Sequence, residues 1–263
     1  MFQGMTENME QIESMTMLFP PGGCKKVYEI YGEEGSGKTQ YLHHLLALHL
    51  LPAEWNGVTL GGYNTGVVFM DNDYHLNMLR LTVIMENRII EAFSKQTELT
   101  TPADDELDAF IKQCLQNVYI MRCSSTTQMV ITLHSLEQLL KNKSNVSVLM
   151  IDSISAFYWI DRSNGGESVS AQETMLIKAC HVIEKLKDTY NLLIYASKPA
   201  IFSSTQDEHC EYLCKSWQRL VDHRLIVSHY SEFHIKSDPA KSKLRLDANF
   251  SITETGINFI NAG

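Results

Sequence analysis

The sequence of 263 residues lacks several features that mark membrane and secreted proteins. Its six cysteines include no C-x-x-C pair, so reduced and buried thiols are expected rather than a disulfide framework. No uninterrupted apolar stretch approaches the ~18 residues that a membrane-spanning helix requires. The first twenty residues contain Glu10 and Glu13 and no apolar run, which argues against a secretory signal peptide. We therefore expect an intracellular, soluble protein with no membrane association.

Positive charge is also scarce. Lysine and arginine number 22 against 31 aspartates and glutamates, which gives a formal net charge of −9. A chain this acidic cannot hold nucleic acid through bulk charge, so any DNA contact has to come from a local patch or from a partner. Hydrophobic residues make up 44% of the chain, enough for a substantial core, which excludes wholesale disorder.

Clusters of metal-ligating residues are rare in the sequence. The nearest approach to one consists of His209, Cys210, Cys214 and His223. Their spacing matches no common zinc template, so packing within the core or on a helix face is favoured over a zinc site.

Short apolar runs alternate with amphipathic stretches along most of the chain. This pattern predicts an α/β fold, with a mostly parallel, doubly wound sheet flanked by helices. The Met-rich residues 1–20 are expected to form a flexible arm, and residues 21–263 a single domain. Strands are expected at 26–31, 67–70, 118–121, 146–151 and 192–196, with helices beginning near 39, 76, 107, 129 and 171.

Two further details follow from the hydrophobic pattern. Short strands near 224–229, 232–236, 244–251 and 256–260 indicate an antiparallel meander at the C-terminal edge of the sheet. The second helix is marked by the apolar residues Leu76, Leu79, Val83 and Ile90.

The strongest motif is G-x-x-x-x-G-K-T, placed between the first expected strand and the first expected helix. Its glycines let the backbone curl so that successive N–H groups point at phosphate oxygens, and the helix N-terminus adds a partial positive charge. Lys38 is expected to reach the terminal phosphates, and the Thr39 hydroxyl to ligate Mg²⁺. The alternative is a glycine-rich turn without a ligand. The members of the motif are Gly32, Glu33, Glu34, Gly35, Ser36, Gly37, Lys38 and Thr39.

Two acidic groups bear on this loop in opposite ways. Glu33 and Glu34 lie beside the proposed anion site and weaken its field unless they point outward. Asp152 ends the apolar run V-L-M-I-D, the pattern in which a buried strand aims one carboxylate at the Mg²⁺ shell. An aspartate that merely caps a strand is the alternative. Together with Lys38 and Thr39, Asp152 favours a Mg²⁺ site.

Several segments resemble the RecA-like recombinases and their eukaryotic paralogues. Residues 71–81, D-N-D-Y-H-L-N-M-L-R-L, resemble the segment D-T-E-G-T-F-R-x-x-R-L of the recombinases. Residues 153–168, S-I-S-A-F-Y-W-I-D-R-S-N-G-G-E-S, and 212–218, Y-L-C-K-S-W-Q, resemble one paralogue branch. The resemblance covers nearly everything after the N-terminal arm. It implies a RecA-like P-loop ATPase core that binds ATP and Mg²⁺, without the N-terminal helical domain of full-length recombinases.

Two positions depart from the pattern of active recombinases. Asp73 stands where they keep a glutamate that polarises the attacking water, and a carboxylate about 1 Å short can cost ~10²-fold in rate. Lys198, in A-S-K-P, stands where they carry an Asn-Gln pair that senses the γ-phosphate. A lysine there can neutralise phosphate but cannot accept a hydrogen bond. Nucleotide binding is therefore expected to be better preserved than hydrolysis, and whether the chain is an enzyme stays open.

A third position keeps the recombinase residue. Arg80 aligns with the arginine that stacks on adenine in the family, a role that suits its planar guanidinium. An ordinary helix-surface arginine is the alternative.

The resemblance also implies a biological role. It predicts a nuclear subunit of a four-paralogue complex, with the sister paralogue designated D as its immediate neighbour. That complex supports the main recombinase on single-stranded DNA during homologous recombination repair of double-strand breaks and stalled forks. The alternatives are a competent DNA-dependent ATPase that acts directly on single-stranded DNA, and a small-molecule kinase that shares only the phosphate loop. No Arg-rich lid segment supports the kinase.

Direct DNA contact is expected to be weak. The expected second DNA loop, 200–208, contains Asp207 and Glu208 but no lysine or arginine. The aromatic run at 157–159 lies near a first DNA loop, where packing or a partner interface is favoured over stacking on bases.

Overall fold

The computed structural model describes residues 20–96, 102–201, 209–242 and 246–260. Nine strands form one sheet in the order β11-β10-β9-β8-β1-β7-β6-β4-β5. The pairs from β5 to β8 are parallel, and β9, β10 and β11 continue the sheet in antiparallel pairing. The predicted α/β architecture, with antiparallel strands at the C-terminal edge, is confirmed.

The strands of this sheet follow the apolar runs of the sequence closely. A two-stranded hairpin, β2 (Glu54–Trp55) with β3 (Val58–Thr59), lies outside it. The nine strands are β1 (Val27–Gly32), β4 (Gly66–Asp71), β5 (Val118–Met121), β6 (Val146–Asp152), β7 (Leu193–Pro199), β8 (His223–His229), β9 (Phe233–Ser237), β10 (Asp247–Thr253) and β11 (Gly256–Ile260).

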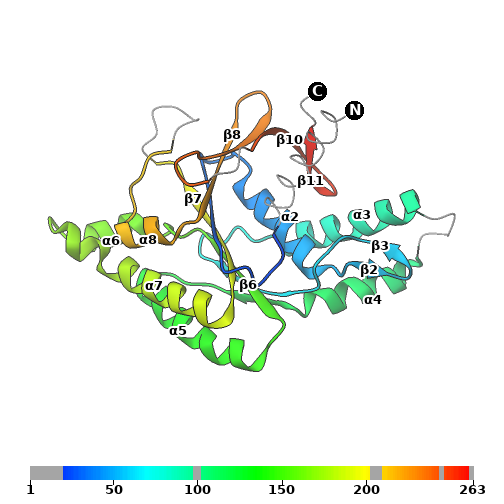
Figure 1. Cartoon of the computed structure of the whole chain (residues 1–263), viewed down its shortest axis with the longest axis horizontal. Helices are drawn as coiled ribbons and strands as arrows, with labels where there is room; N and C mark the ends of the chain where they lie inside the picture. The colour runs from blue at the N-terminus through cyan, green and yellow to red at the C-terminus, as the bar shows by residue number, and fades with distance from the viewer. Residues whose placement is uncertain (1–19, 97–101, 202–208, 243–245, 261–263) are drawn as a thin grey trace, which may run out of the picture.

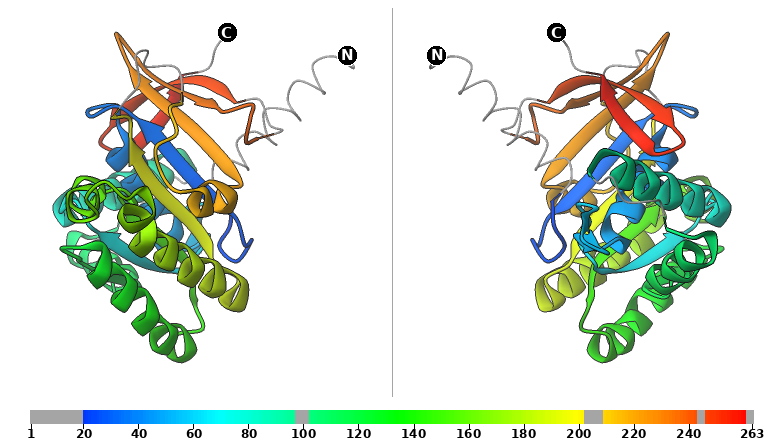
Figure 2. Two further views of the ribbon diagram at one scale, coloured as in Figure 1. Left: turned by 90° about the vertical axis from the view of Figure 1, so that its left-hand side faces the viewer. Right: turned by 90° about the vertical axis from the view of Figure 1, so that its right-hand side faces the viewer.

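Helices cover both faces of the sheet, as Figure 1 shows. On one side lie α2 (Lys38–Leu50), α3 (Met78–Gln96) and α4 (Asp104–Leu115), and on the other α5 (Thr126–Asn142), α7 (Val169–Tyr190) and α8 (Lys215–Leu220), with α6 (Tyr158–Asn164) leading into α7. The two side views in Figure 2 show the C-terminal strands extending the sheet beyond these helices.

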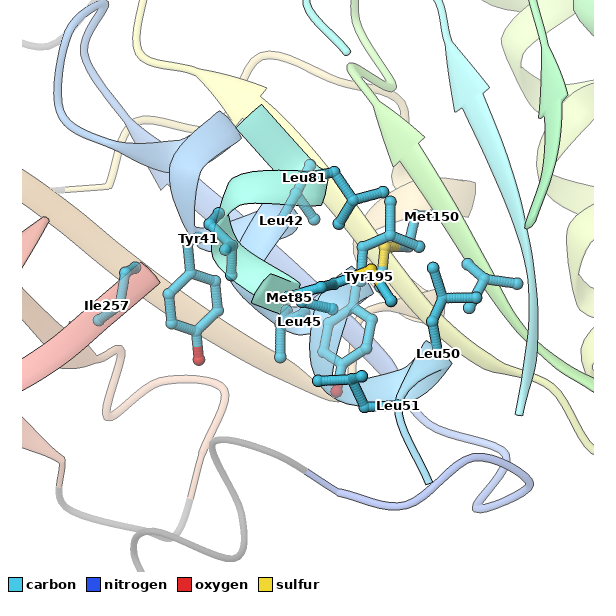
Figure 3. Packing of buried hydrophobic residues seen from close by; sticks show 14 of the residues in the cluster. Tyr41, Leu42, Leu45, Leu50, Leu51, Leu81, Met85, Met150, Tyr195 and Ile257 are labelled. Atoms are coloured by element: carbon cyan, nitrogen blue, oxygen red, sulfur yellow. The ribbon is translucent and has the colours of Figure 1, made fainter. Parts of the chain in front are cut away.

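The two faces of the sheet bury two separate hydrophobic cores because strand side chains alternate between them. In β4, Val67 and Phe69 belong to the first core, with α2, α3 and α4, whereas Val68 and Met70 belong to the second core, with α5, α7 and α8. Figure 3 shows part of the first core, in which leucines of α2 meet Leu81 of α3 and Tyr195 of β7. This alternation decides which strand residues can reach the site described below.

The second helix is confirmed, but its four marker residues do not share one face: Leu76 is buried in the first core and Ile90 packs against that core. Leu79 is 80% exposed and Val83 is 37% exposed, whereas Leu81 and Ile84 are fully buried in the first core. The helix carries two apolar stripes with helical spacing, and only the packing against α2 decides which one is covered. The short helices α6 and α8 and the β2–β3 hairpin were not predicted.

Two sequence-based expectations fall largely outside the residues that the structure describes. The arm expected at 1–20 lies outside the described residues except for Pro20, and so does most of the second DNA loop expected at 200–208. In the part of the chain that is described, no helix is long and apolar enough to cross a membrane.

Candidate nucleotide-binding site

The G-x-x-x-x-G-K-T motif forms the turn between β1 and α2. Gly37 has a φ of 97°, a left-handed conformation that glycine adopts without strain and that starts α2 at Lys38. A side chain at Gly32 would place its Cβ 2.1 Å from the Val227 carbonyl oxygen, so only glycine fits where β1 passes β8. The motif therefore has the strand–loop–helix context that a phosphate-binding loop requires.

Lys38 lies folded over this loop. Its ammonium donates hydrogen bonds to the carbonyl oxygens of Gly32, at 2.9 Å, and Glu33, at 2.5 Å. Burial lowers the pKa of Lys38 to about 8, against the opposing pull of nearby carboxylates. The loop thus holds a cationic donor at its centre, where a phosphate oxygen would compete with main-chain carbonyls for the same protons.

Asp152 reaches the loop from the end of β6. Its Oδ2 accepts a hydrogen bond from Thr39 Oγ1 at 3.1 Å, and its Oδ1 accepts one from the Ser197 hydroxyl. Burial raises the pKa of Asp152, the nearby Asp73 adds to this, and the hydroxyl donors oppose it. Thr39 and Asp152, which the sequence predicts as Mg²⁺ ligands, therefore lie side by side with oxygen atoms suited to that ion.

A cavity of about 430 Å³ opens above these groups. Its charged side chains are Lys38 and three carboxylates, those of Glu34, Asp73 and Asp152. An excess of negative charge repels a triphosphate unless a divalent cation offsets it. The remaining lining residues are Gly35, Gly37, Thr39, Gln40, His75, Ser153, Ser197, Pro199, Phe233 and Ile252.

Asp73 is tied to the Mg²⁺ side of this cavity by its backbone. The N–H groups of Asn72 and Asp73 donate to the Asp152 carbonyl oxygen at 2.7 and 3.0 Å, which extends the β4–β6 pairing past the end of β4. The half-buried Asp73 side chain lines the cavity, at the place where the sequence predicts the catalytic carboxylate.

His43 joins the Thr39 end of α2 to the segment that follows Asp73. Its Nδ1 lies 2.7 Å from the Thr39 carbonyl oxygen, and its Nε2 accepts a hydrogen bond from the Asn77 N–H at 3.1 Å. These contacts require a neutral ring with the proton on Nδ1. Burial lowers the pKa of His43, which favours that state.

Arg80 and the two loop glutamates have distinct places. Arg80 lies outside the cavity lining and donates to Gln40 Oε1 at 3.2 Å and to the Thr253 carbonyl oxygen, so it links α2, α3 and β10. Glu34 is exposed and lines the cavity, whereas Glu33 does not line it. The guanidinium is thus held beside Gln40, at the rim of the cavity.

Lys198 does not face the cavity, contrary to the expectation that it neutralises phosphate. The neighbouring Ser197 lines the cavity, and strand alternation sends Lys198 to the opposite face of β7. There Lys198 is fully buried and donates to Glu211 Oε1 at 2.6 Å. A phosphate in the cavity would therefore have no contact with this ammonium.

The residues weighed as a zinc pattern serve other contacts. His209 lies 3.0 Å from the Lys198 ammonium, and His223 stacks on Tyr28 with 4.8 Å between ring centroids. Among the described residues, no group of three His, Cys, Asp or Glu side chains is arranged to hold a metal ion.

The aromatic run at 157–159, which spans the start of α6, is only partly buried. Phe157 is buried and Tyr158 packs edge-on against Tyr212, whereas Trp159 is 59% exposed. Trp159 also packs edge-on against Tyr158, so all three rings have packing contacts within the chain.

Sequence reasoning missed several members of the site. Ser197 was not predicted, because only its neighbour Lys198 was compared with the recombinase residues. The only sign of His43 in the sequence is its position four residues after Thr39, one helical turn along the same helix. Gln40, His75, Phe233 and Ile252 come from separate elements that only the fold brings to the cavity.

Comparison with known proteins identifies the family of the chain. The Rad51 family model matches residues 15–246. The chain is 36% identical over 254 residues to the mouse (Mus musculus) DNA repair protein XRCC2, covering 89% of this chain and 84% of that protein. It is 25% identical to the Arabidopsis thaliana XRCC2 homolog, covering 79% and 70% of the two chains. The DNA repair and recombination protein RadA of Haloquadratum walsbyi is 24% identical, covering 65% and 50%. The chain therefore belongs to the Rad51 family.

Proposed function

We propose that this chain is an ATP-binding recombinase paralogue subunit that supports homologous recombination repair and hydrolyses ATP slowly or not at all. The observation that carries the nucleotide site is the 3.1 Å hydrogen bond between Thr39 and Asp152, beside the ammonium of Lys38. Thr39 and Asp152 are 113 positions apart in the sequence. A glycine-rich turn without a ligand would not explain why their side chains are in contact.

Each group has a defined task in holding ATP. The loop amides and the Lys38 ammonium bind the β- and γ-phosphates, and the start of α2 adds its partial charge. Thr39 and Asp152 hold Mg²⁺, which offsets phosphate charge that the carboxylates of the cavity would otherwise repel. Arg80 is the residue that would stack on the adenine ring of ATP, after its hydrogen bond to Gln40 breaks.

Two features of the site support weak hydrolysis. The carboxylate that lines the cavity in the catalytic position is Asp73, one methylene shorter than the glutamate of active recombinases. No lysine or arginine from β7 faces the cavity, since Lys198 is buried on the other side of the strand. The site can bind and orient a triphosphate but has little with which to activate water or stabilise the transferred phosphate.

The relatives suggest the biological setting. Two of them are named as DNA repair proteins, and the third as a DNA repair and recombination protein. We propose that the chain works in the nucleus beside the sister paralogue designated D, within a four-paralogue complex. The main recombinase and single-stranded DNA are reached through that complex, since the chain carries a net charge of −9.

Steady-state hydrolysis separates this proposal from the alternative of a competent DNA-dependent ATPase. The purified chain is assayed with and without single-stranded DNA, with Lys38→Ala to reveal contaminating activity. We expect turnover at the Lys38→Ala level in both conditions. A DNA-stimulated rate on the order of 1 s⁻¹, ordinary for an enzyme, would favour the alternative.

Co-expression with the sister paralogue tests the subunit role. The two chains should elute together in size-exclusion chromatography at micromolar concentration. Separate elution would contradict the proposed neighbour while leaving the nucleotide site untouched.

A further inference from the structure

A network of buried charges lies on the face of the sheet opposite the phosphate loop. Glu29 of β1 is fully buried, and it accepts hydrogen bonds from Arg224 of β8 and from the Trp217 indole N–H, the latter at 2.6 Å. Arg224 is paired with Glu29 in the β1–β8 register, so both side chains point to the same face. Arg224 also donates to Asp238 Oδ2 at 2.9 Å.

Glu211 joins this network to the strand beside the phosphate site. Its Oε2 accepts from Arg224 at 3.1 Å, and its Oε1 accepts from the Lys198 ammonium at 2.6 Å. The same Oε1 also accepts the backbone N–H groups of Tyr212 and Leu213, both at 3.0 Å. Through Glu211, Lys198 of β7 thereby holds the backbone that leads into α8, and no ligand takes part in these contacts.

The charges of this network nearly balance without any ligand. The cations Lys198 and Arg224 pair with the carboxylates of Glu29, Glu211 and Asp238. His209 lies beside this network, 3.0 Å from the Lys198 ammonium. Separating buried, hydrogen-bonded charges is strongly unfavourable, because each would be left without its partner in a poorly solvated environment. The arrangement is therefore expected to persist whether or not a nucleotide occupies the cavity.

On its other face, β7 offers little that could respond to a terminal phosphate. The Ser197 hydroxyl already donates to Asp152, and Pro199 has no N–H group to donate. The Pro199 carbonyl oxygen accepts a hydrogen bond from the Tyr212 hydroxyl at 2.6 Å, which ties it to the same segment. The polar groups at the end of β7 and those of residues 209–214 are thus already hydrogen-bonded to other groups of the chain.

We propose that the Lys198–Glu211–Arg224 network holds residues 209–214 in one conformation regardless of nucleotide, so that this segment does not distinguish ATP from ADP. This inference rests on the proposed nucleotide site and adds to it the absence of γ-phosphate signalling along β7. Nucleotide would then stabilise the phosphate loop without switching the surface around α8. Any partner bound at that surface would meet the same conformation with either nucleotide.

Hydrogen exchange measured by mass spectrometry tests this directly. The full chain is compared alone, with Mg·ADP and with Mg·ATPγS, following peptides that cover 27–41 and 209–214. We expect both nucleotides to slow exchange in the phosphate loop and to leave the rates in 209–214 unchanged to within about twofold. This comparison uses the natural chain and needs no variant.

Three further comparisons test the role of the network. Lys198→Met should speed exchange in 209–214 by roughly tenfold or more, because it leaves Glu211 without its closest partner. Lys185→Met, which breaks an exposed pair with Glu137, is the matched control and should leave 209–214 unchanged. If Lys198→Met does not fold, the double variant Lys198→Met/Glu211→Gln, which removes both charges, should show the same acceleration.

The possible failures can be told apart. Slower exchange in 209–214 with Mg·ATPγS but not with Mg·ADP would overturn this inference and leave the proposed function standing. An unchanged rate in 209–214 in a folded Lys198 variant would overturn the role of the network. Unchanged exchange in the phosphate loop with either nucleotide would overturn the proposed function, and with it the nucleotide part of this inference.

Discussion

The Thr39 hydroxyl and the Asp152 carboxylate meet across the ends of α2 and β6, with 3.1 Å between Oγ1 and Oδ2. The two residues are far apart in the sequence, and β6 and β1 are separated in the sheet by β7. The contact exists because the carboxyl ends of parallel strands share one edge of the sheet, where ligands of such folds bind. It makes the role of each residue in Mg²⁺ binding separately testable.

Asp152→Asn should weaken the Mg²⁺ dependence of nucleotide binding. The amide keeps one oxygen acceptor for either the Thr39 or the Ser197 hydroxyl but loses the charge that attracts the cation. We expect the apparent Mg²⁺ affinity in the presence of nucleotide to fall by roughly 10- to 100-fold. Fluorescent-nucleotide titrations at several Mg²⁺ concentrations measure this. Asp161→Asn, in a half-buried residue that accepts from Thr126, is the control, and equal effects of both variants would contradict the assignment.

His44 makes the fold sensitive to acid. Its Nδ1 accepts a hydrogen bond from the Ile257 N–H at 3.0 Å, which ties β11 to α2, and burial lowers its pKa to about 3. An unfolded histidine titrates near 6.5, so below that pH the unfolded chain binds a proton that the folded chain does not. Stability from His44 is therefore present above about pH 6.5 and is lost as the pH falls toward 3.

A non-titrating replacement isolates this contribution. Between pH 7 and pH 5, His44 alone should cost about 2 kcal/mol of unfolding free energy. His44→Asn keeps a possible acceptor for the Ile257 N–H but binds no proton, so it should lose correspondingly less stability over that range. Chemical denaturation at the two pH values measures the difference, and parallel losses in both proteins would contradict the prediction.

Two leucines on α3 test which face of that helix is buried. Leu81 lies in the first core with no exposed surface, whereas Leu79 is 80% exposed. Leu81→Ala should lower the unfolding free energy by about 2–5 kcal/mol. Leu79→Ala should change it by no more than about 0.5 kcal/mol. Similar losses from both variants in urea denaturation would show that the outer stripe is also covered.

The contrast between these leucines shows what the sequence could and could not supply. The phosphate loop was found because its members are contiguous and each has a fixed spacing to the next. The buried face of α3 could not be predicted from the sequence, since two apolar stripes satisfy one periodicity and the choice depends on the packing against α2. Short helices such as α8, with six residues, contain too few turns to show a period at all.

The fate of Lys198 has a different cause. Its sequence position next to the site is correct, but its side chain lies on the other face of β7, where it pairs with Glu29 and Glu211. Those partners come from two other segments, and their convergence depends on strand order and register rather than on any local pattern. A residue next to a site residue on a strand thus has its side chain on the opposite face of the sheet, away from the ligand.

Calorimetric titration of Mg·ATPγS into the natural chain and into Lys38→Ala tests the central claim most directly. We expect the natural chain to bind one equivalent and Lys38→Ala to bind roughly 10- to 100-fold more weakly, since a hydrogen bond to a charged group contributes about 1.5–3 kcal/mol. Lys95→Ala, which breaks an exposed pair with Glu91, should bind like the natural chain. Equal affinities of Lys38→Ala and the natural chain, or no binding by the natural chain, would contradict the account.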